Sequence, residues 1–167
     1  MNSPSEHQPR AIPHPTTTIQ HRVTDVAAGL IFRNGKILIT KRQEGAHLGG
    51  LWEFPGGKRE AGETFEQCLA RELQEELGIN VTVGALFESI THDYPEKTVH
   101  LKFFVCRLEA GEPRPIGCAA LKWVAKSEMK DCVFPAADAR LLEELQQNLD
   151  LWNEQQSGWV SRAIFDA

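Results

Sequence analysis

The fold of this chain is decided by one stretch, Gly57-Lys58-Arg59-Glu60-Ala61-Gly62-Glu63-Thr64-Phe65-Glu66-Gln67-Cys68-Leu69-Ala70-Arg71-Glu72-Leu73-Gln74-Glu75-Glu76-Leu77-Gly78-Ile79. It predicts a glycine turn, a short loop and one helix. Thr64 followed three residues later by Gln67 is typical of a capping box at a helix start. Gly78 fits the residue just beyond a helix end. These signals predict a helix over residues 65–77.

The predicted helix has an apolar stripe with an acidic flank. At about 100° per residue, the stripe is formed by Leu69, Ala70, Leu73 and Leu77. Three carboxylates fall within about 100° of one another on its flank, those of Glu72, Glu75 and Glu76. They repel one another, and a cation such as Mg²⁺ or Mn²⁺ would remove that repulsion by binding their oxygens. Taken alone, such a cluster is more often a solvated helix face.

The stretch as a whole resembles the signature of the Nudix hydrolases. That signature reads Gly, five residues, Glu, seven residues, Arg-Glu-apolar, one residue, Glu-Glu, one residue, Gly-apolar. Its fixed places are filled here by Gly57, Glu63, Arg71, Glu72, Leu73, Glu75, Glu76, Gly78 and Ile79. A match at every fixed place makes coincidence a poor explanation. The resemblance implies the Nudix fold, an α/β fold with a mixed β-sheet in an α/β/α sandwich.

The order of elements along the chain favours the same architecture. Strands are expected at 23–32, 37–41, 51–54, 81–91, 98–108 and 121–124, with a bulge at Gly84. The Asn-Gly pair within 33–36 is typical of a hairpin turn. A helical turn is expected at 127–130 and a second helix at about 136–149. Strands interleaved with two helices favour a sheet covered on both faces.

Three segments are expected along the chain. Residues 1–21 contain four prolines and few apolar side chains, so we expect a flexible tail there. Residues 22–150 are expected to form the Nudix hydrolase domain. Residues 151–167 are expected to be a C-terminal extension, whose structure is ambiguous in the sequence.

Bulk properties restrict the class of protein. A length of 167 residues with 41% hydrophobic and 25% charged residues fits one soluble domain. The net charge of −5 argues against direct nucleic-acid binding. The absence of a long apolar run argues against a membrane span. The four cysteines lack metal-ligand spacing, and we expect reduced thiols in a cytoplasmic protein that is a monomer or a homodimer.

Outside the signature, the resemblance extends over about residues 24–148 and is to MutT-type Nudix proteins. It is carried by 51–58, 111–113, 121–124 and 134–138. MutT-type enzymes hydrolyse (deoxy)nucleoside triphosphates to the monophosphate and pyrophosphate. Among their known substrates are 8-oxo-dGTP and, for a related group, CTP and oxidised pyrimidine nucleotides. Hydrolysis of another nucleoside diphosphate linked to X, and nucleotide binding without catalysis, are the alternatives; the intact signature glutamates argue against the second.

The resemblance also implies roles for individual residues. The expected ligands of Mg²⁺ (or Mn²⁺) are the Gly56 carbonyl, Glu72, Glu75 and Glu76. Glu72 is the first candidate to activate the attacking water, and Glu63 supports the loop or a metal-bound water. Arg71 and Gly57 have structural roles, with Arg71 paired to Glu63. Arg42 and Lys58 are expected to contact phosphates, although ordinary surface charge explains them as well.

The base pocket implied by the resemblance lies around Phe54 and residues 27–29. Asp138 stands where MutT-type proteins carry an asparagine that reads the base. An ionised carboxylate only accepts hydrogen bonds, whereas an amide donates and accepts. Asp138 therefore favours a base edge rich in N–H groups, and a role as N-cap of the last helix is the alternative.

A second departure from the MutT-type pattern is Gly117. It occupies the position of a further metal-binding glutamate. Glu112 or Glu109 is the expected substitute, unless the site has one ligand fewer.

Overall fold

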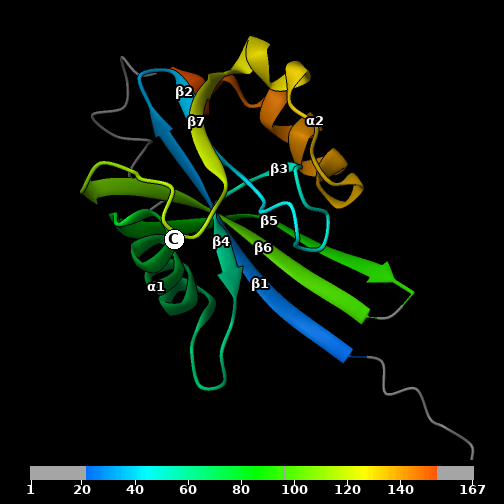
Figure 1. Ribbon diagram of the computed structural model, residues 1–167. Helices are drawn as coiled ribbons and strands as arrows, with labels where there is room; N and C mark the ends of the chain where they lie inside the picture. The colour runs from blue at the N-terminus through cyan, green and yellow to red at the C-terminus, as the bar shows by residue number, and fades with distance from the viewer. Residues whose placement is uncertain (1–21, 96, 154–167) are drawn as a thin grey trace, which may run out of the picture.

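The computed structural model of the protein describes residues 22–95 and 97–153. The expected tail over 1–21 and the expected extension beyond residue 153 lie outside the described residues. Figure 1 shows the described chain as a sheet with helices on both sides.

The strands are β1 (Arg22–Arg33), β2 (Lys36–Lys41), β3 (Trp52–Glu53), β4 (Gly56–Lys58), β5 (Asn80–Tyr94), β6 (Lys97–Ala110) and β7 (Ala120–Ala125). The α-helices are α1 (Phe65–Leu77) and α2 (Ala139–Gln147). Three 3-10 helices complete the fold: η1 (Lys126–Asp131), η2 (Ala136–Asp138) and η3 (Leu149–Trp152). All six predicted strands and both predicted helices are present.

The sheet is mixed and centred on β1. Its order is β3-β2-β1-β6-β5, with β4 pairing to β1 and β7 to β2. β1 runs parallel to β6 and antiparallel to β2 and β4. Since β2 and β4 both pair with β1, the chain between them, including β3, returns to the sheet beside the first strand. This arrangement brings the start of the signature against β1.

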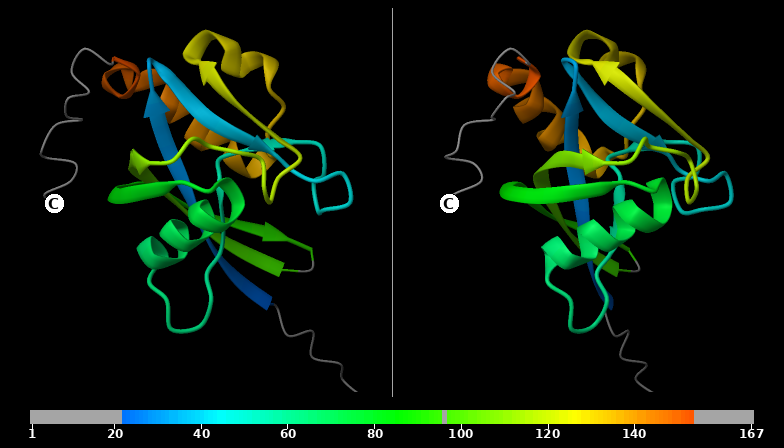
Figure 2. Two further views of the ribbon diagram at one scale, coloured as in Figure 1. Left: turned by 60° about the vertical axis from the view of Figure 1, so that its left-hand side comes forward. Right: turned by 90° about the vertical axis from the view of Figure 1, so that its left-hand side faces the viewer.

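Helices cover both faces of the sheet, as the alternation of side chains along β1 requires. Ala28 and Leu30 face a core that includes Leu141 and Leu145 of α2. Ala27 and Ile31, on the opposite face, meet a second core built with Leu69, Leu73 and Leu77 of α1. Figure 2 shows α1 and α2 on opposite sides of the sheet. The α/β/α sandwich is therefore confirmed.

The ends of α1 follow the predicted signals. The Thr64 hydroxyl accepts from the Gln67 backbone N–H at 3.2 Å, and the Gln67 side chain accepts from the Thr64 N–H at 2.9 Å. Gly78 adopts a left-handed conformation, with φ of 69°. This backbone conformation is strained for other residues and ends the helix.

Three details differ from the sequence-based expectation. Residues 56 and 57, expected as part of a turn over 55–57, instead belong to the short strand β4, because residues 56–58 pair with β1. The helix expected over 136–149 is divided into η2 and α2. Residues 151 and 152, expected to begin an extension, belong to the core: the buried Trp152 indole donates to the Leu145 carbonyl at 2.9 Å.

Candidate active site

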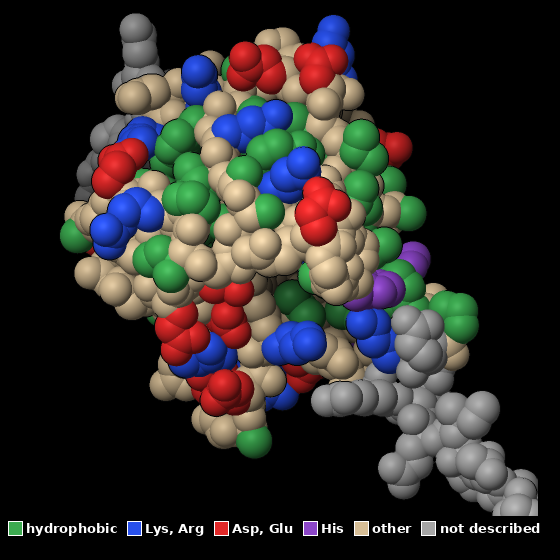
Figure 3. Space-filling view, in the orientation of Figure 1, with side chains coloured by type: hydrophobic (Ala, Val, Ile, Leu, Met, Phe, Trp, Pro, Cys, Tyr) green, Lys and Arg blue, Asp and Glu red, His purple; other side chains and the backbone are tan. Residues whose placement is uncertain are grey.

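A pocket of about 420 Å³ opens between α1, β4 and the loop that follows β2. Figure 3 shows a hollow near the centre of the molecule, with acidic side chains gathered on its α1 side. Among the residues that line the pocket are most of those predicted from the sequence: Arg42, Phe54, Gly56, Gly57, Lys58, Glu72, Glu76 and Asp138. Side chains from distant parts of the chain thus converge on one cavity.

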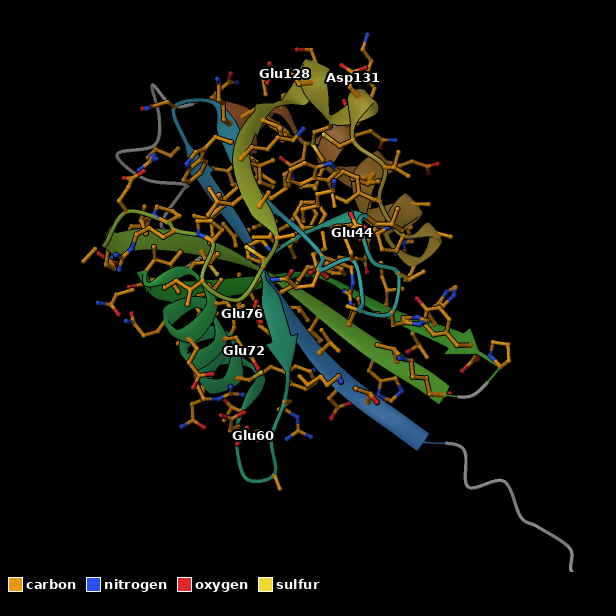
Figure 4. All side chains as sticks on the ribbon, in the orientation of Figure 1. Glu44, Glu60, Glu72, Glu76, Glu128 and Asp131 are labelled. Atoms are coloured by element: carbon orange, nitrogen blue, oxygen red, sulfur yellow. The ribbon has the colours of Figure 1, made fainter. Side chains whose placement is uncertain are left out.

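Two carboxylates of α1, four residues apart, form one wall of the pocket. Glu72 and Glu76 lie on the side of α1 that faces β4 (Figure 4). The Glu72 carboxyl group packs closely on Gly57: a Cβ on Gly57 would lie 2.2 Å from the Glu72 carboxyl carbon and would displace it. Burial raises the pKa of Glu76 to about 7, and the nearby charges of Glu72 and Glu53 add to the effect. Proximity of like charges in a half-buried site makes this wall favourable for a cation.

Arg71 links three glutamates of the signature. Its Nε donates to Glu63 Oε1 at 2.6 Å and its Nη2 to Glu63 Oε2 at 3.0 Å. Its Nη1 donates to Glu72 at 3.0 Å and to Glu75 at 3.1 Å. The expected ion pair between Arg71 and Glu63 is therefore present. The hydrogen bonds from Arg71 lower the pKa of Glu63 to about 2, so Glu63 is ionised at neutral pH.

Glu75 lies apart from the two pocket carboxylates. Its side chain is 59% exposed and turns towards Arg71, and it does not line the pocket. Within residues 22–95 and 97–153, no three His, Cys, Asp or Glu side chains are grouped closely enough to hold a metal ion. The structure thus brings Glu72, Glu76 and Gly56 to the pocket but does not bring Glu75 with them.

Glu53 is a pocket residue that we did not predict. It lies beside Arg42, with which it forms an ion pair, and burial raises its pKa. Arg42 also donates from Nε to the His47 carbonyl at 2.8 Å, which ties the loop after β2 to the site. A charged residue between Trp52 and Phe54 in a short, half-buried strand was the available signal. Lys58 lines the pocket nearby and is exposed.

The other end of the pocket is apolar. Phe54 is buried and packs edge-on against Phe103 and nearly parallel to Phe134, with ring centroids 6.0 and 5.4 Å apart. Ala27 and Ala28 of β1 form an adjoining wall. This end of the pocket has the apolar, aromatic character of a site for a flat ring.

The mouth of the pocket carries residues that the sequence did not single out. Tyr94 and Lys97, from the ends of β5 and β6, line it together with His47. The His47 and Tyr94 rings meet edge-on, with centroids 5.3 Å apart. Their approach joins the loop after β2 to the β5–β6 hairpin, a contact that no local pattern in the sequence indicates.

Comparisons with known proteins agree with this arrangement. A model of the NUDIX domain family matches residues 27–144. The chain belongs to this family. An "8-oxo-dGTP diphosphatase" from Haemophilus influenzae is 40% identical over 126 residues, which cover 74% of this chain and 92% of the relative. A "CTP pyrophosphohydrolase" from Escherichia coli is 38% identical over 127 residues, covering 73% and 90%.

A solved structure also supports membership of the NUDIX family. The crystal structure of a MutT NUDIX hydrolase from Burkholderia pseudomallei has a TM-score of 0.66 and 28% identity, covering 75% of this chain and 99% of that one. Together, these relatives identify the protein as a Nudix hydrolase, a pyrophosphohydrolase of the MutT type. Such enzymes use divalent metal cations.

The donor set of this Nudix site suits a hard divalent cation. Carboxylate oxygens of Glu72 and Glu76 face the pocket, and hard cations prefer oxygen ligands. The pKa of Glu76 is raised mainly by burial and further by the nearby charges of Glu72 and Glu53, and a bound cation would favour the ionised form of such a group. The residues present therefore fit Mg²⁺ or Mn²⁺.

Gly117 lines the Nudix pocket and leaves no room for a side chain. A Cβ there would lie 2.7 Å from Glu76 Cγ. The expected substitutes are held elsewhere: Glu112 forms a two-pronged ion pair with Arg33 at 2.8 and 2.9 Å, and Glu109 pairs with Arg107. Neither lines the pocket, so the expectation that one replaces the missing glutamate is wrong. Besides Glu72, the pocket carboxylate that lies near Glu76 is that of Glu53.

Asp138 lies at the pocket with only 4% of its surface exposed. It occupies the N-cap position of α2, but its side chain makes no capping hydrogen bond. The capping alternative is therefore not supported. Burial raises the pKa of Asp138 to about 7, with a contribution from Glu53. The neutral form is thus abundant at neutral pH, and the expectation of a pure acceptor needs correction.

Proposed function

We propose that the protein hydrolyses 8-oxo-dGTP or a related oxidised (deoxy)nucleoside triphosphate to the monophosphate and pyrophosphate, and so removes damaged nucleotides from the precursor pool. The observation that carries this proposal is the polarity of the pocket. Its apolar end, with Phe54 and Asp138, suits a base, and its α1 wall, with Glu72 and Glu76, suits a metal-bound triphosphate. One cavity offers the chemistry for both ends of the substrate.

Each residue then has a definite task. A bound divalent cation would be held by Glu72, Glu76 and the Gly56 carbonyl, and it would offset phosphate charge and lower the pKa of a bound water. Glu72 orients the attacking water, and Glu63 keeps the loop in place through Arg71. Lys58 and Arg42 compensate phosphate charge. Glu75 would join the cation only by turning towards the pocket, since its side chain is 59% exposed and does not line the pocket in the structure.

The base is recognised by packing and by one buried carboxyl group. The ring lies against Phe54 and the β1 alanines. Asp138 meets the base edge, either as a neutral carboxyl that donates and accepts or as an acceptor when ionised. Expulsion of water from this apolar end strengthens the hydrogen bond that Asp138 makes.

CTP and oxidised cytosine nucleotides are the second candidate substrates. The observation in their favour is an acid at residue 138, where the MutT pattern has an amide; an ionised acid accepts well from a cytosine amino group. The relative named CTP pyrophosphohydrolase supports this alternative.

A panel of nucleotides separates these proposals. Pyrophosphate release is measured for 8-oxo-dGTP, dGTP, dCTP, CTP and 5-hydroxy-dCTP with saturating Mg²⁺, and again with chelator. The highest kcat/KM for 8-oxo-dGTP supports the first proposal, and the highest for a cytosine nucleotide supports the second. Faster hydrolysis of a nucleotide sugar or dinucleotide than of every triphosphate would contradict both.

A further inference from the structure

Arg59 lies where β4 passes into the loop that carries Glu63. Its backbone N–H donates to the Asp25 carbonyl at 2.9 Å, which extends the β1–β4 pairing by one residue. The side chains of the same two residues also meet: Arg59 Nη2 and Nε donate to Asp25 Oδ2 at 2.6 and 3.1 Å. Both side chains are about three-quarters shielded from solvent, at 31% and 24% exposure, so this ion pair is more than a surface contact.

The same guanidinium holds the loop itself. Arg59 Nη1 donates to the Glu63 carbonyl at 2.9 Å. Its plane lies over the Phe65 ring, at 5.1 Å from the ring centroid. One side chain therefore joins the first strand, the loop and the first turn of α1.

Asp25 is fixed from a second side by His100 of β6. β1 and β6 run in parallel with Asp25 opposite His100, and His100 Nδ1 lies 3.2 Å from Asp25 Oδ1. Both oxygens of Asp25 are thus engaged. The carboxylate that receives Arg59 is anchored in the centre of the sheet and not in the loop.

These contacts continue without a break to the α1 wall of the pocket. Arg59 holds the Glu63 backbone carbonyl, Arg71 holds the Glu63 carboxylate, and Arg71 also holds Glu72. Within the loop, the Glu60 N–H donates to the Glu63 carboxylate at 2.9 Å. The Glu60 side chain, at the loop tip in Figure 4, is exposed, and nothing lies within 4 Å of the position of a Cβ on Gly62.

We propose that Arg59 and Asp25 are positioning residues for hydrolysis, which fix Glu72 through Glu63 and Arg71. The inference rests on the proposed role of Glu72 and goes beyond it. Neither residue lines the pocket, and neither belongs to the nine fixed positions of the signature. Their loss is expected to loosen the Glu63 loop while leaving substrate-binding groups in place.

The test uses the full chain with Arg59→Met, Asp25→Asn and the double variant. Arg59→Met keeps an unbranched apolar stem and the backbone pairing to β1, so the fold is retained. Loss of alignment at Glu72 is expected to lower kcat by about 10- to 100-fold in each single variant. KM for the nucleotide is expected to stay near its wild-type value, and the double variant to be no slower than the slower single one. Hydrogen–deuterium exchange of residues 59–66 is expected to rise.

Arg107→Met is the matched control. Arg107 is also an arginine ion-paired to a carboxylate, Glu109, but it lies on β6 away from the pocket. Its variant is expected to keep wild-type kcat. Arg59→Lys provides a second variant that retains charge without the fork of donors, and an intermediate kcat is expected.

Three results would overturn the inference: wild-type kcat in both Arg59 variants, additive losses in the double variant, or a rise in KM with kcat unchanged. Glu72→Gln, measured alongside, distinguishes a failure of the proposed role of Glu72 from a failure of the positioning role of Arg59. An active Glu72→Gln enzyme contradicts the proposed role of Glu72 itself. An inactive one, together with fully active Arg59→Met, contradicts only the positioning role.

Discussion

Asp138, which is buried, and Glu76, which is half-buried, are acidic side chains from different elements that line the same pocket. Burial is the main reason that the pKa of each is raised to about 7. A neutral carboxyl group donates and accepts hydrogen bonds, whereas the ionised form only accepts. Within the physiological pH range, Asp138 can therefore meet a base either as a donor and acceptor or as an acceptor alone. An asparagine at the same place has one hydrogen-bonding pattern at every such pH.

We predict that base selectivity depends on pH through Asp138. In the wild type, the ratio of kcat/KM for cytosine to guanine nucleotides should change between pH 6 and pH 8, because a neutral Asp138 donates and accepts, an ionised one only accepts, and the two base edges differ in their donors and acceptors. In Asp138→Asn the ratio should be nearly constant. A mismatched buried polar group costs about 1–3 kcal/mol, so the change is measurable by initial rates. Parallel profiles in the two proteins would exclude Asp138 from base recognition.

At this scale the sequence predicted the residues whose place is set by local spacing. Glu72 and Glu76 follow from the signature, and Arg71 from its pairing with Glu63. Glu53 was missed because its role depends on Arg42, eleven positions earlier, and on a pocket that exists only in the folded chain. The raised pKa of Asp138 was missed for the same reason: burial is a property of the packed structure.

Helix α1 is fixed at both ends, and its C-terminal end is held by the loop before β7. The backbone N–H groups of Ile116 and Gly117 donate to the Glu76 carbonyl, each at 3.0 Å, and that of Arg114 donates to the Leu77 carbonyl at 3.0 Å. These bonds satisfy carbonyls that a helix end leaves free. The loop thus presses its backbone against the residue that carries a pocket carboxylate.

We predict that Gly117→Ala lowers kcat by about 10-fold or more, because the new Cβ would displace Glu76 from its position. Gly45→Ala is the control, since nothing lies within 4 Å of a Cβ at Gly45. Steady-state pyrophosphate release measures both. Unchanged kcat in Gly117→Ala would mean that Glu76 relaxes at no catalytic cost.

Elements with strong periodicity or clear end signals were predicted well, and those created by tertiary contact were not. The capping box and Gly78 predicted α1 from its own residues. β4 could not be predicted because a three-residue strand with two glycines has no alternating pattern, and it is extended only because β1 pairs with it. The division of the last helix into η2 and α2 was likewise not indicated by its apolar periodicity.

At the scale of the whole molecule, the pocket uses both layers of the sandwich. α1 supplies the acidic wall, and the residues before α2 supply Pro135, Ala137 and Asp138. Of the described residues, none belongs to a helix that is long and apolar enough to cross a membrane.

Burial of charged groups in the pocket between the two layers lowers the stability of the folded protein, and a bound cation would raise it.

We predict that the folded protein is more stable slightly below neutral pH than above it. The pKa values of Glu76 and Asp138 are raised from 4.5 and 3.8, so the folded state binds more protons in this window. The free energy of unfolding should therefore fall as pH rises through about 4 to 7. Glu63, with its pKa lowered to about 2, acts oppositely and only at acid pH.

Urea denaturation at pH 5.5 and pH 8 measures this dependence. The double variant Glu76→Gln with Asp138→Asn should show a smaller difference between the two pH values than the wild type. Mg²⁺ should stabilise the wild type more at pH 8, where the carboxylates are ionised. A wild-type protein that is more stable at pH 8 without metal would contradict the assigned burial of these groups.

The central claim is that the carboxylates of α1 carry metal-dependent hydrolysis of a nucleoside triphosphate. The most direct test is pyrophosphate release with Mg²⁺ by Glu72→Gln and Glu76→Gln, with Glu66→Gln, an exposed residue in the first turn of α1, as control. We predict that kcat falls by about 10³-fold or more in the first two variants, the scale of losing a principal electrostatic group, and stays at the wild-type value in Glu66→Gln. Near wild-type kcat in both Glu72→Gln and Glu76→Gln would contradict the claim.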